Sequence, residues 1–380
     1  MEVASVDAIP LSYQLGDGRG YGSARGTVTQ RTSTLIRVET GDGAVGWGEA
    51  FGPPKSIATL VDELLTDMVV GMDPYEVESL CDRNYTGLYH FGSRGVVQSA
   101  ISGIDIALWD LIGRVTGTSI ARLLGGRNRE HVTPYASTMY ITQWGQPPAE
   151  PIQAAVDEGF SAAKIKIGRN IEDDVERVQI ARDRLGDDAR LMVDCNGNYR
   201  PEQAIELDDA LSPFDVSWIE EPIPPENRSG YAELKRAIDT PVAAGEASYG
   251  RFEFKELIDD RTVDVVQPDV CKCGGLSEAR FIAKLATTEN LAVSPHVWTG
   301  AVGLAASLQF AGSLPNYPHS TNVPEPVLFE VDRADNGLRE ELLTEPFDFA
   351  GDTLEIPDAP GLGVEPDPAA IERYRVDQSG

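Results

Sequence analysis

The fold of this chain is decided by short apolar stretches that recur at nearly constant spacing: AAKIKIG (162–168), LMVDCNG (191–197), VSWIEEP (216–222), PVAAGEA (241–247) and VVQPDV (265–270). The charged residues that close them are, in order, Lys166, Asp194, Glu220, Glu246 and Asp269. The three central acids are 26 residues apart, which is about the length of one strand–helix unit. We therefore interpret each charged residue as the last residue of a parallel strand. A parallel barrel gathers such strand ends at one rim.

The three central carboxylates indicate a metal site at this rim. A single Asp or Glu at the end of a strand is usually a turn residue or a helix cap, but three at equal spacing favour a shared function. Carboxylates that converge on one place repel each other unless a cation lies between them. Hard oxygen ligands in a water-accessible site favour Mg²⁺.

Alternation of strands and helices begins near residue 129. HVTPYAST (131–138) predicts the first barrel strand, and VLFEV (327–331) predicts the last. Three of the intervening segments have clear helical character: IEDDVERVQIARDRLG (171–186), PEQAIELDDALS (201–212) and SEARFIAKLATTEN (277–290). This order predicts an α/β barrel domain over residues 129–331.

The rest of the chain predicts a smaller unit beside the barrel. Residues 1–128 look like an α+β domain, with a hairpin in which 32–40 and 44–50 flank Gly41-Asp42-Gly43. Helices are predicted at 99–113 and 119–126. The segment 332–380 is rich in Pro and Gly, and we expect it to return to the N-terminal unit.

The composition excludes several classes of protein. The formal net charge is −29, from 61 acidic and 32 basic residues, which argues against nucleic acid as a partner. No apolar run reaches the ~20 residues of a membrane span, and the start MEVASVDAIP shows no signal peptide. The four cysteines form no CxxC pair, so we expect free thiols. We expect a cytoplasmic protein that binds neither nucleic acid nor membrane.

The use of lysine carries two further predictions. Only seven of the 32 basic residues are lysine, and an acidic, lysine-poor composition is typical of a halophilic protein. Two of the seven, Lys164 and Lys166, are alternate residues of one predicted strand and so share a face. Two ammonium groups this close, near a divalent cation, would lower each other's pKa and make a lysine usable as a base.

Taken together, the motifs resemble those of the enolase superfamily, mandelate racemase subgroup. The resemblance covers almost the whole chain and is carried by GWGEA (46–50), IDIALWDLIGR (104–114), KIKIG (164–168), VDCN (193–196), WIEEP (218–222), AGEA (244–247), QPDVCKCGG (267–275), PHVWTG (295–300) and LFEVDRADNGLREEL (328–342). It implies a modified TIM barrel, (β/α)7β, under an α+β capping domain. It also implies one Mg²⁺ per subunit and a small-molecule carboxylate substrate. We also expect a homo-oligomer.

The resemblance implies a role for each matching residue. Asp194, Glu220 and Glu246 match the metal ligands, and Glu221 would then be a supporting residue. Lys166 matches a base and Lys164 a group that steadies the substrate carboxylate. Asn196 is expected to point the same way as Asp194, because side chains alternate along a strand, and we expect it to bind the substrate as well. Asp269 would orient His296, whereas the muconate-lactonising subgroup carries lysine at the position of Asp269. Glu330 matches a protonated acid that hydrogen-bonds the substrate.

These residues serve more than one reaction. Lys166 and His296 on opposite faces of one α-carbon would allow dehydration of a sugar acid to a 2-keto-3-deoxy acid, which is our leading hypothesis. They would equally allow a racemase or epimerase of a 2-hydroxy acid. A catalytically silent metal-binding protein is the third alternative. Which of the two bases abstracts the proton stays open.

Substrate specificity is expected in two glycine-rich loops of the capping domain, residues 15–26 and 48–55. Arg19, Tyr21 and Arg25 are the candidate contacts in the first loop. The other histidines, His90, His131 and His319, are interpreted as structural or surface residues.

Overall fold

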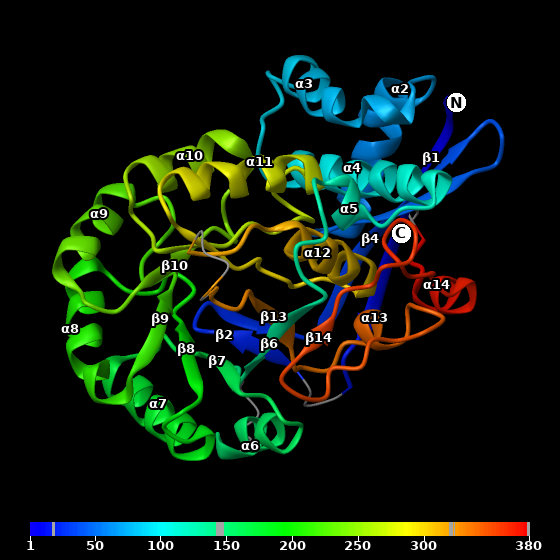
Figure 1. Ribbon diagram of the computed structural model, residues 1–380. Coiled ribbons are helices and arrows are strands. Elements are labelled where there is room, and N and C mark those ends of the chain that lie inside the picture. The colour runs from blue at the N-terminus through cyan, green and yellow to red at the C-terminus, as the bar shows by residue number, and fades with distance from the viewer. Residues whose placement is uncertain (17–19, 142–147, 319–321, 323, 378–380) are drawn as a thin grey trace.

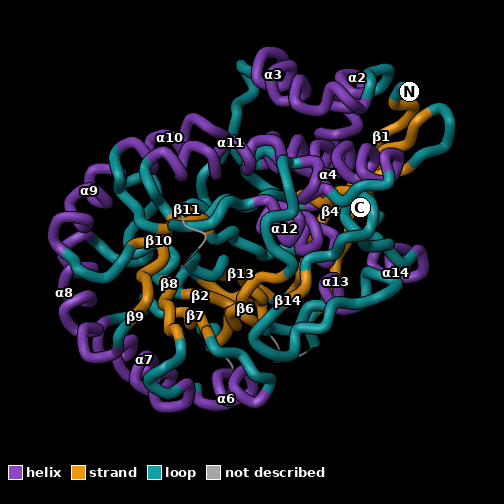
Figure 2. Tube along the Cα trace, in the orientation of Figure 1, coloured by secondary structure: helices purple, strands orange, loops and turns teal. Residues whose placement is uncertain are grey.

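The computed structural model describes all residues except 17–19, 142–147, 319–321, 323 and 378–380, and the statements below concern the described residues. Strands and helices alternate through the second part of the chain, with the strands inside a ring of helices (Figures 1 and 2). The barrel strands are β6 (His131–Thr138), β7 (Ala162–Lys166), β8 (Arg190–Asp194), β9 (Val216–Glu220), β10 (Val242–Ala244), β11 (Val265–Val266), β12 (Ala292–Val293) and β13 (Leu328–Asp332). The helices between them are α6 (Ala149–Asp157), α7 (Ile171–Leu185), α8 (Pro201–Leu211), α9 (Arg228–Ala237), α10 (Gly250–Asp259), α11 (Gly275–Thr288) and α12 (Ala301–Ser313).

The strand order confirms the predicted modified barrel. The strands pair in parallel in the order β12-β11-β10-β9-β8-β7-β6-β13, so the first and last barrel strands are neighbours. Where β12 meets β13, the Ser294 hydroxyl donates a hydrogen bond of 2.8 Å to the carbonyl of Leu328. Seven strand–helix units and a final strand are the (β/α)7β pattern.

A layer of large side chains fills the barrel below the rim. Tyr135, Met192 and Trp218 are at most 3% exposed, and the rings of Tyr135 and Trp218 meet edge to face at 5.8 Å. These side chains come from β6, β8 and β9, because alternate residues of each strand point inward. The layer gives the rim residues a rigid floor.

The prediction that each charged residue ends a strand is right for three residues and wrong for two. Lys166, Asp194 and Glu220 close β7, β8 and β9. Glu246 and Asp269 lie in the loops beyond β10 and β11, and His296 likewise lies beyond β12. Proline has no N–H to continue a ladder, and a proline stands directly before both Asp269 and His296. Before Glu246, Gly245 takes a positive φ of 143° and turns the chain out of the sheet.

The capping domain is built on an antiparallel sheet in the order β1 (Val3–Gln14), β4 (Gln30–Thr40), β5 (Val45–Ala50). The predicted hairpin between β4 and β5 is confirmed. A second, small hairpin joins β2 (Tyr21–Ser23) to β3 (Gly26–Val28) and reaches over the barrel (Figure 1). The helical segments are α1 (Pro54–Leu60), η1 (Val61–Leu65), α2 (Thr66–Val69), η2 (Pro74–Glu76), α3 (Val77–Gly87), α4 (Val96–Thr116) and α5 (Ile120–Leu123).

Helix α4 is the core helix of this domain and runs beyond the predicted 99–113, whereas α5 is shorter than the predicted 119–126. By length and composition alone α4 could cross a membrane, but 89% of its apolar window is buried in the fold. It packs against β4, β5 and α11, so it contacts both the capping sheet and the barrel.

The C-terminal segment contains α13 (Gly337–Glu340), β14 (Leu354–Glu355) and α14 (Pro368–Tyr374). Helix α14 lies against β1: the rings of Tyr13 and Tyr374 meet at 5.7 Å, and the N–H of Val376 donates to the carbonyl of Pro10. Strand β14 pairs with the start of β6. Cys195, Cys271 and Cys273 are buried free thiols.

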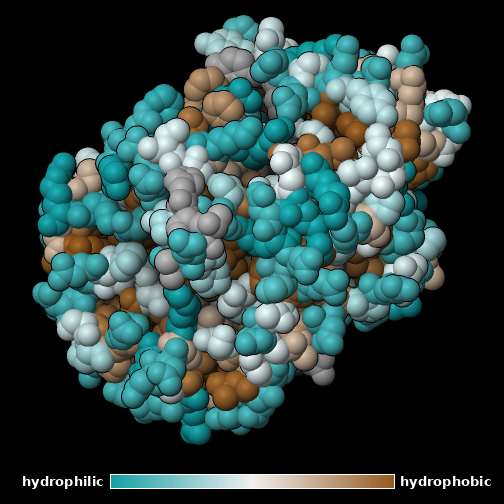
Figure 3. All heavy atoms as spheres, viewed as in Figure 1, coloured by the Kyte–Doolittle hydropathy of each residue, from teal (hydrophilic) through white to brown (hydrophobic). Residues whose placement is uncertain are grey.

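The acidic surface leads to a testable prediction. Polar residues, drawn in teal, cover most of the face seen in Figure 3, and the net charge is −29. Unscreened carboxylates repel each other, so the free energy of unfolding should fall as KCl is lowered from about 2 M to about 0.1 M. Urea titrations at both salt concentrations measure this, and equal midpoints would contradict the halophilic interpretation.

Candidate active site

Seven successive strands each carry a titratable residue towards the rim, at the strand end or just after it in six of them and, for Glu330, within β13. In the order β7 to β13 these residues are Lys166, Asp194, Glu220, Glu246, Asp269, His296 and Glu330. The structure thus brings together these seven residues, which the sequence indicates as site residues.

Three carboxylates form the centre of the rim. One oxygen each from Asp194, Glu220 and Glu246 lies within 4.8 Å of the others. Glu220 is held from below by the Trp218 indole N–H (3.2 Å) and by the Gln267 amide (2.7 Å). Among the described residues, the buried Oε2 of Glu246 has no hydrogen-bond partner. A compact set of hard oxygen ligands with an unsatisfied oxygen fits a divalent cation such as Mg²⁺.

The backbone after β8 shapes one side of this triad. Asn196 has a φ of 44°, in the left-handed region that asparagine tolerates. This turn brings its N–H to 2.8 Å from one oxygen of Asp194, and its side-chain amide to 3.2 Å from the other. Glu221 follows Glu220 with a φ of 37° and is buried. Burial, together with the charges of Glu246, Asp194 and Glu220, raises the pKa of Glu221 well above its ordinary value.

The two lysines neutralise the carboxylates, and their pKa values change in the direction opposite to the prediction. Lys166 pairs with Asp194, and Lys164 pairs with Glu220 and, at 2.8 Å, with Glu330. Burial acts to lower the pKa of each lysine, but the paired carboxylates outweigh burial and raise it. The prediction considered the repulsion between the two ammonium groups and a nearby divalent cation, and it left out the acids that each lysine contacts.

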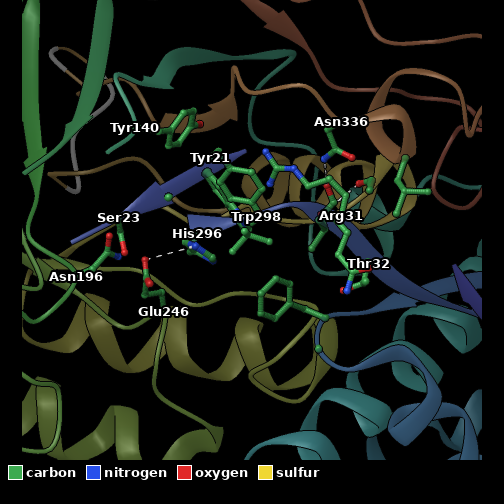
Figure 4. Close-up of a pocket in the computed structure, with 18 of the residues that line it drawn as sticks. Tyr21, Ser23, Arg31, Thr32, Tyr140, Asn196, Glu246, His296, Trp298 and Asn336 are labelled. Atoms are coloured by element: carbon green, nitrogen blue, oxygen red, sulfur yellow. Dashed lines mark hydrogen bonds and ion pairs between the residues drawn. The ribbon is translucent and has the colours of Figure 1, made fainter. Parts of the chain in front are cut away.

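His296 and Asp269 form the expected pair. Nδ1 of His296 lies 2.8 Å from Oδ2 of Asp269, and the other oxygen of Asp269 accepts from the N–H of Cys271 at 2.8 Å. Nε2 of His296 lies 3.4 Å from Oε2 of Glu246 (Figure 4). Burial opposes the charged imidazole, but Glu246 and Asp269 outweigh it and raise the pKa of His296 to about 9.

The surroundings of Glu330 lower its pKa, which is the opposite direction from the one that the prediction of a protonated acid requires. Burial alone would raise its pKa, but the ammonium of Lys164, with His296 and Lys166, lowers it to about 2. Its carboxylate also accepts from the N–H of Val297 at 3.1 Å. Lys164 is 1% exposed and Glu330 is 0% exposed, so both side chains are covered by protein. Their proposed contacts with a substrate stay predictions.

A cavity of about 420 Å³ opens above the triad. From the barrel rim it is lined by Lys166, Asn196, Glu246 and His296, and an aromatic wall completes it. This wall consists of Tyr21 from the capping domain, Tyr140 after β6 and Trp298 after β12, with ring centroids 5.6–5.7 Å apart (Figure 4).

The sequence did not single out Tyr140 or Trp298 as cavity residues. Trp298 stands two residues after His296 in PHVWTG, so strand alternation is a signal that could have found it. Tyr140 follows β6, which ends in no charged residue.

Both predicted specificity loops, residues 15–26 and 48–55, reach the cavity, but not every candidate contact lines it. Tyr21 lines it, and so does Phe51 from the second loop. Arg25 instead fastens the β2–β3 hairpin to the barrel, because its guanidinium donates to the carbonyls of Asn196 and Gly197. Arg19 lies outside the described residues.

Neither His90 nor His131, which we interpreted as structural or surface residues, lines the cavity. His131 is exposed at the start of β6, and the ring of His90 contacts Tyr89 at 5.2 Å. His319 lies outside the described residues.

Two family models of known proteins match the two domains of the chain. Residues 149–370 match the family model of the enolase C-terminal domain-like proteins. Residues 19–125 match the mandelate racemase / muconate lactonizing enzyme N-terminal domain. The chain therefore belongs to the enolase superfamily, and within it to the mandelate racemase subgroup.

Individual relatives narrow the class of enzyme. The chain is 38% identical to a D-galactarolactone cycloisomerase from Agrobacterium fabrum over 99% of both chains. It is 32% identical to an arabinonate dehydratase from Saccharolobus solfataricus over 89% of both. A crystal structure of a 3,6-anhydro-D-galactonate cycloisomerase from Zobellia galactanivorans superposes with a TM-score of 0.88, at 33% identity, covering 99% of this chain and 100% of that one. The chain is accordingly a lyase or an isomerase of this superfamily.

Proposed function

We propose that the chain removes the proton α to the carboxylate of a sugar acid and expels a β-substituent, which is a β-elimination. The observation that carries the proposal is the presence of two candidate proton-transfer groups, Lys166 and His296, in one cavity that Glu246 of the acidic triad also lines. The two groups come from β7 and β12, which are separated by other strands in either direction around the rim. A substrate bound between them would present one face of its α-carbon to each group.

The difficulty of the reaction is the charge that develops when the α-proton leaves. The product of abstraction is an enediolate, which carries a second negative charge next to the carboxylate. A divalent cation held by Asp194, Glu220 and Glu246, which we propose to be Mg²⁺, would stabilise that charge. Lys164 is the protein's own cation nearest to Glu220 and would add to this stabilisation.

Lys166 and His296 have different charged partners, and these partners suit them to different proton transfers. The raised pKa of His296 favours the charged imidazole, which suits a general acid that protonates the departing oxygen. Lys166 acts as a base only when its pair with Asp194 is broken, because that pair raises its pKa. The proton removed from carbon by one group and the proton given to the leaving oxygen by the other balance the elimination.

Two leaving groups are compatible with this chemistry. Loss of a β-hydroxyl is dehydration to a 2-keto-3-deoxy acid, as the names of the dehydratase relatives suggest. Loss of a ring oxygen opens a lactone or an anhydro ring without loss of water. The 38% identity to a D-galactarolactone cycloisomerase across 99% of both chains favours this second candidate.

A panel of sugar acids and their lactones, incubated with Mg²⁺, tests the proposal. Dehydration gives a keto acid lighter than the substrate by one water, and ring opening gives a keto acid of unchanged mass. A racemase or epimerase would give an isomer without a new keto group. Keto-acid formation that is equally fast with Lys166→Ala would refute the proposed site.

Asp269→Asn should lower kcat by about 100-fold or more, because the neutral amide no longer fixes and stabilises the imidazolium of His296. Asp264→Asn is the matched control, since Asp264 lies directly before β11, at the other end of the barrel, where it accepts from the N–H of Val242 and pairs with Lys235. Steady-state kinetics of both variants measure the effect. Equal activity of the two would show that Asp269 does not act on His296.

A further inference from the structure

We propose that two buried carboxylates of the capping domain, Glu49 and Asp105, position the His296–Asp269 pair. They do so by capping the barrel helices that follow the two catalytic loops. The catalytic consequence rests on the proposed function, whereas the positioning itself does not. Both residues lie outside the cavity and hydrogen-bond to neither member of the pair, so they set its position through the backbone.

The loops that carry the pair lead straight into helices whose first turns need acceptors. Asp269 is followed by α11, which begins at Gly275, and His296 is followed by α12, which begins at Ala301. The residue at the N-cap position is glycine in both helices, Gly274 and Gly300. Glycine has no side chain to accept hydrogen bonds from the first free N–H groups, so the acceptors come from elsewhere.

Glu49 supplies the acceptors for α12. It is the next-to-last residue of β5 and is 0% exposed. One carboxylate oxygen accepts from the N–H of Gly300 at 2.5 Å, and the other accepts from the N–H of Gly303 at 2.7 Å. The hydroxyl of Ser33 donates to the same carboxylate at 2.6 Å. A Cβ at Gly300 would lie 3.0 and 3.1 Å from the two oxygens, which is a tight contact, so glycine favours this close approach.

Asp105 does the same for α11 from the core helix α4. It is 0% exposed, and its carboxylate accepts from both the N–H (3.1 Å) and the hydroxyl of Ser277. One turn earlier on the same helix face, the Ser102 hydroxyl accepts from the N–H of Gly274 at 2.9 Å. Gly275 has a φ of +88°, and a Cβ there would overlap the side chain of Asp105.

The end of β5 contacts the segments that follow both catalytic residues. Directly after Glu49 and Ala50, the N–H of Phe51 donates at 3.1 Å to the carbonyl of Cys271, which lies in the loop of Asp269. One strand of the capping domain therefore holds the loop of Asp269 and, through Glu49, the helix after the loop of His296. A carboxylate at a helix N-terminus is also favoured by the helix dipole. Together these contacts fix the relative position of two loops that no ladder holds, since both residues lie beyond their strands.

The same domain offers a matched control. Asp110, also on α4 and 0% exposed, accepts from the N–H groups of Trp47 and Leu362, both at 2.8 Å. It ties the capping domain to the C-terminal segment and has no contact with either catalytic loop among the described residues. Asp110 also pairs with Arg114 at 2.7 Å, and it meets β5 at Trp47, before the residues that contact the two loops, so its replacement should leave the pair in place.

The experiment compares Glu49→Gln, Asp105→Asn and Asp110→Asn in the full chain. An amide presents N–H groups to backbone donors and so loses at least one acceptor. With ¹⁵N-labelled histidine, the four imidazoles of the chain give few signals, and His296→Asn identifies that of His296. In Glu49→Gln and Asp105→Asn we expect the hydrogen-bonded Nδ1–H signal of His296 to shift or broaden. The Asp110→Asn spectrum should match the wild type.

Kinetics give the second readout. Displacement of a catalytic group by about 1 Å costs about 100-fold in rate, so kcat per folded molecule should fall by that order in Glu49→Gln while KM changes little. In a His296→Asn background, Glu49→Gln should have no further effect on residual α-proton exchange. An unchanged His296 signal in Glu49→Gln and Asp105→Asn overturns the proposal. So does an equal change in Asp110→Asn.

If Glu49→Gln fails to fold, Ser33→Ala removes one donor to the same carboxylate and should give a smaller change of the same kind. The imidazole signal is measured without substrate, so it decides the positioning even if the proposed reaction is wrong. A displaced signal with no activity on any sugar acid, in the wild type as well, would refute the proposed function alone.

Discussion

Lys166→Ala and His296→Asn are each expected to lose at least about 1,000-fold in product formation, and only one of them should also lose exchange of the α-proton with D₂O. The two groups follow non-adjacent strands, β7 and β12, and line one cavity, and in the proposed mechanism a given α-hydrogen faces only one of them. Without the abstracting base no enediolate forms. Without the other group the enediolate forms and recaptures solvent deuterium. Proton NMR of a substrate in D₂O, followed over time, measures both quantities.

The variant that loses deuterium exchange also identifies which residue abstracts the proton. If Lys166 abstracts the proton, Lys166→Ala shows no exchange while His296→Asn still exchanges, and the pattern reverses if His296 abstracts it. Lys284→Ala, at an exposed position on α11, is the control and should keep wild-type activity. Near wild-type turnover in both Lys166→Ala and His296→Asn would reject the proposed active site.

Removal of the metal should have an equally large effect. Dialysis against a chelator should abolish activity, and Mg²⁺ should restore it, because the enediolate has no other divalent charge to stabilise it. Glu246→Gln should weaken Mg²⁺ binding by at least about 100-fold, since it removes a charged ligand from the triad. Isothermal titration calorimetry of the apo-protein measures this affinity without any substrate.

Thermal unfolding gives an independent check on the same site. A ligand at 100 times its Kd stabilises the folded state by about 2.7 kcal/mol, so saturating Mg²⁺ should raise the Tm of the wild type. The Tm of Glu246→Gln should respond little, whereas Glu226→Gln, at an exposed position, should respond like the wild type. Full activity in chelator, or an unchanged affinity in Glu246→Gln, would contradict the metal assignment.

Regular spacing made much of the fold predictable from the sequence. A strand–helix unit has a nearly constant length, so equal spacing of Asp194, Glu220 and Glu246 indicated successive strands, and the structure confirms the barrel. The first barrel strand was predicted at its observed bounds, His131–Thr138, because turn residues and a change of pattern flank it. Local signals of this kind depend on neighbouring residues alone.

The same reasoning explains where the prediction was incomplete. The sequence predicts that β10 ends at Glu246 and β11 at Asp269, but both strands end earlier in the chain. Gly245 and Pro268 interrupt the backbone pairing before the two acids. The aromatic wall of Tyr21, Tyr140 and Trp298 combines three distant parts of the chain, and no single segment contains its pattern.

The sequence by itself determined which groups are present at the rim and in which order, because a parallel barrel turns order along the chain into order around a circle. Only the tertiary structure decided their charge states. Lys166 and Glu330 have pKa values opposite to the predictions because a pKa depends on the distance to each counter-charge, and those distances exist only in the folded molecule. The contacts of Glu49 with Gly300 and of Asp105 with Ser277 likewise join residues far apart in the chain, and folding alone brings them within hydrogen-bond distance.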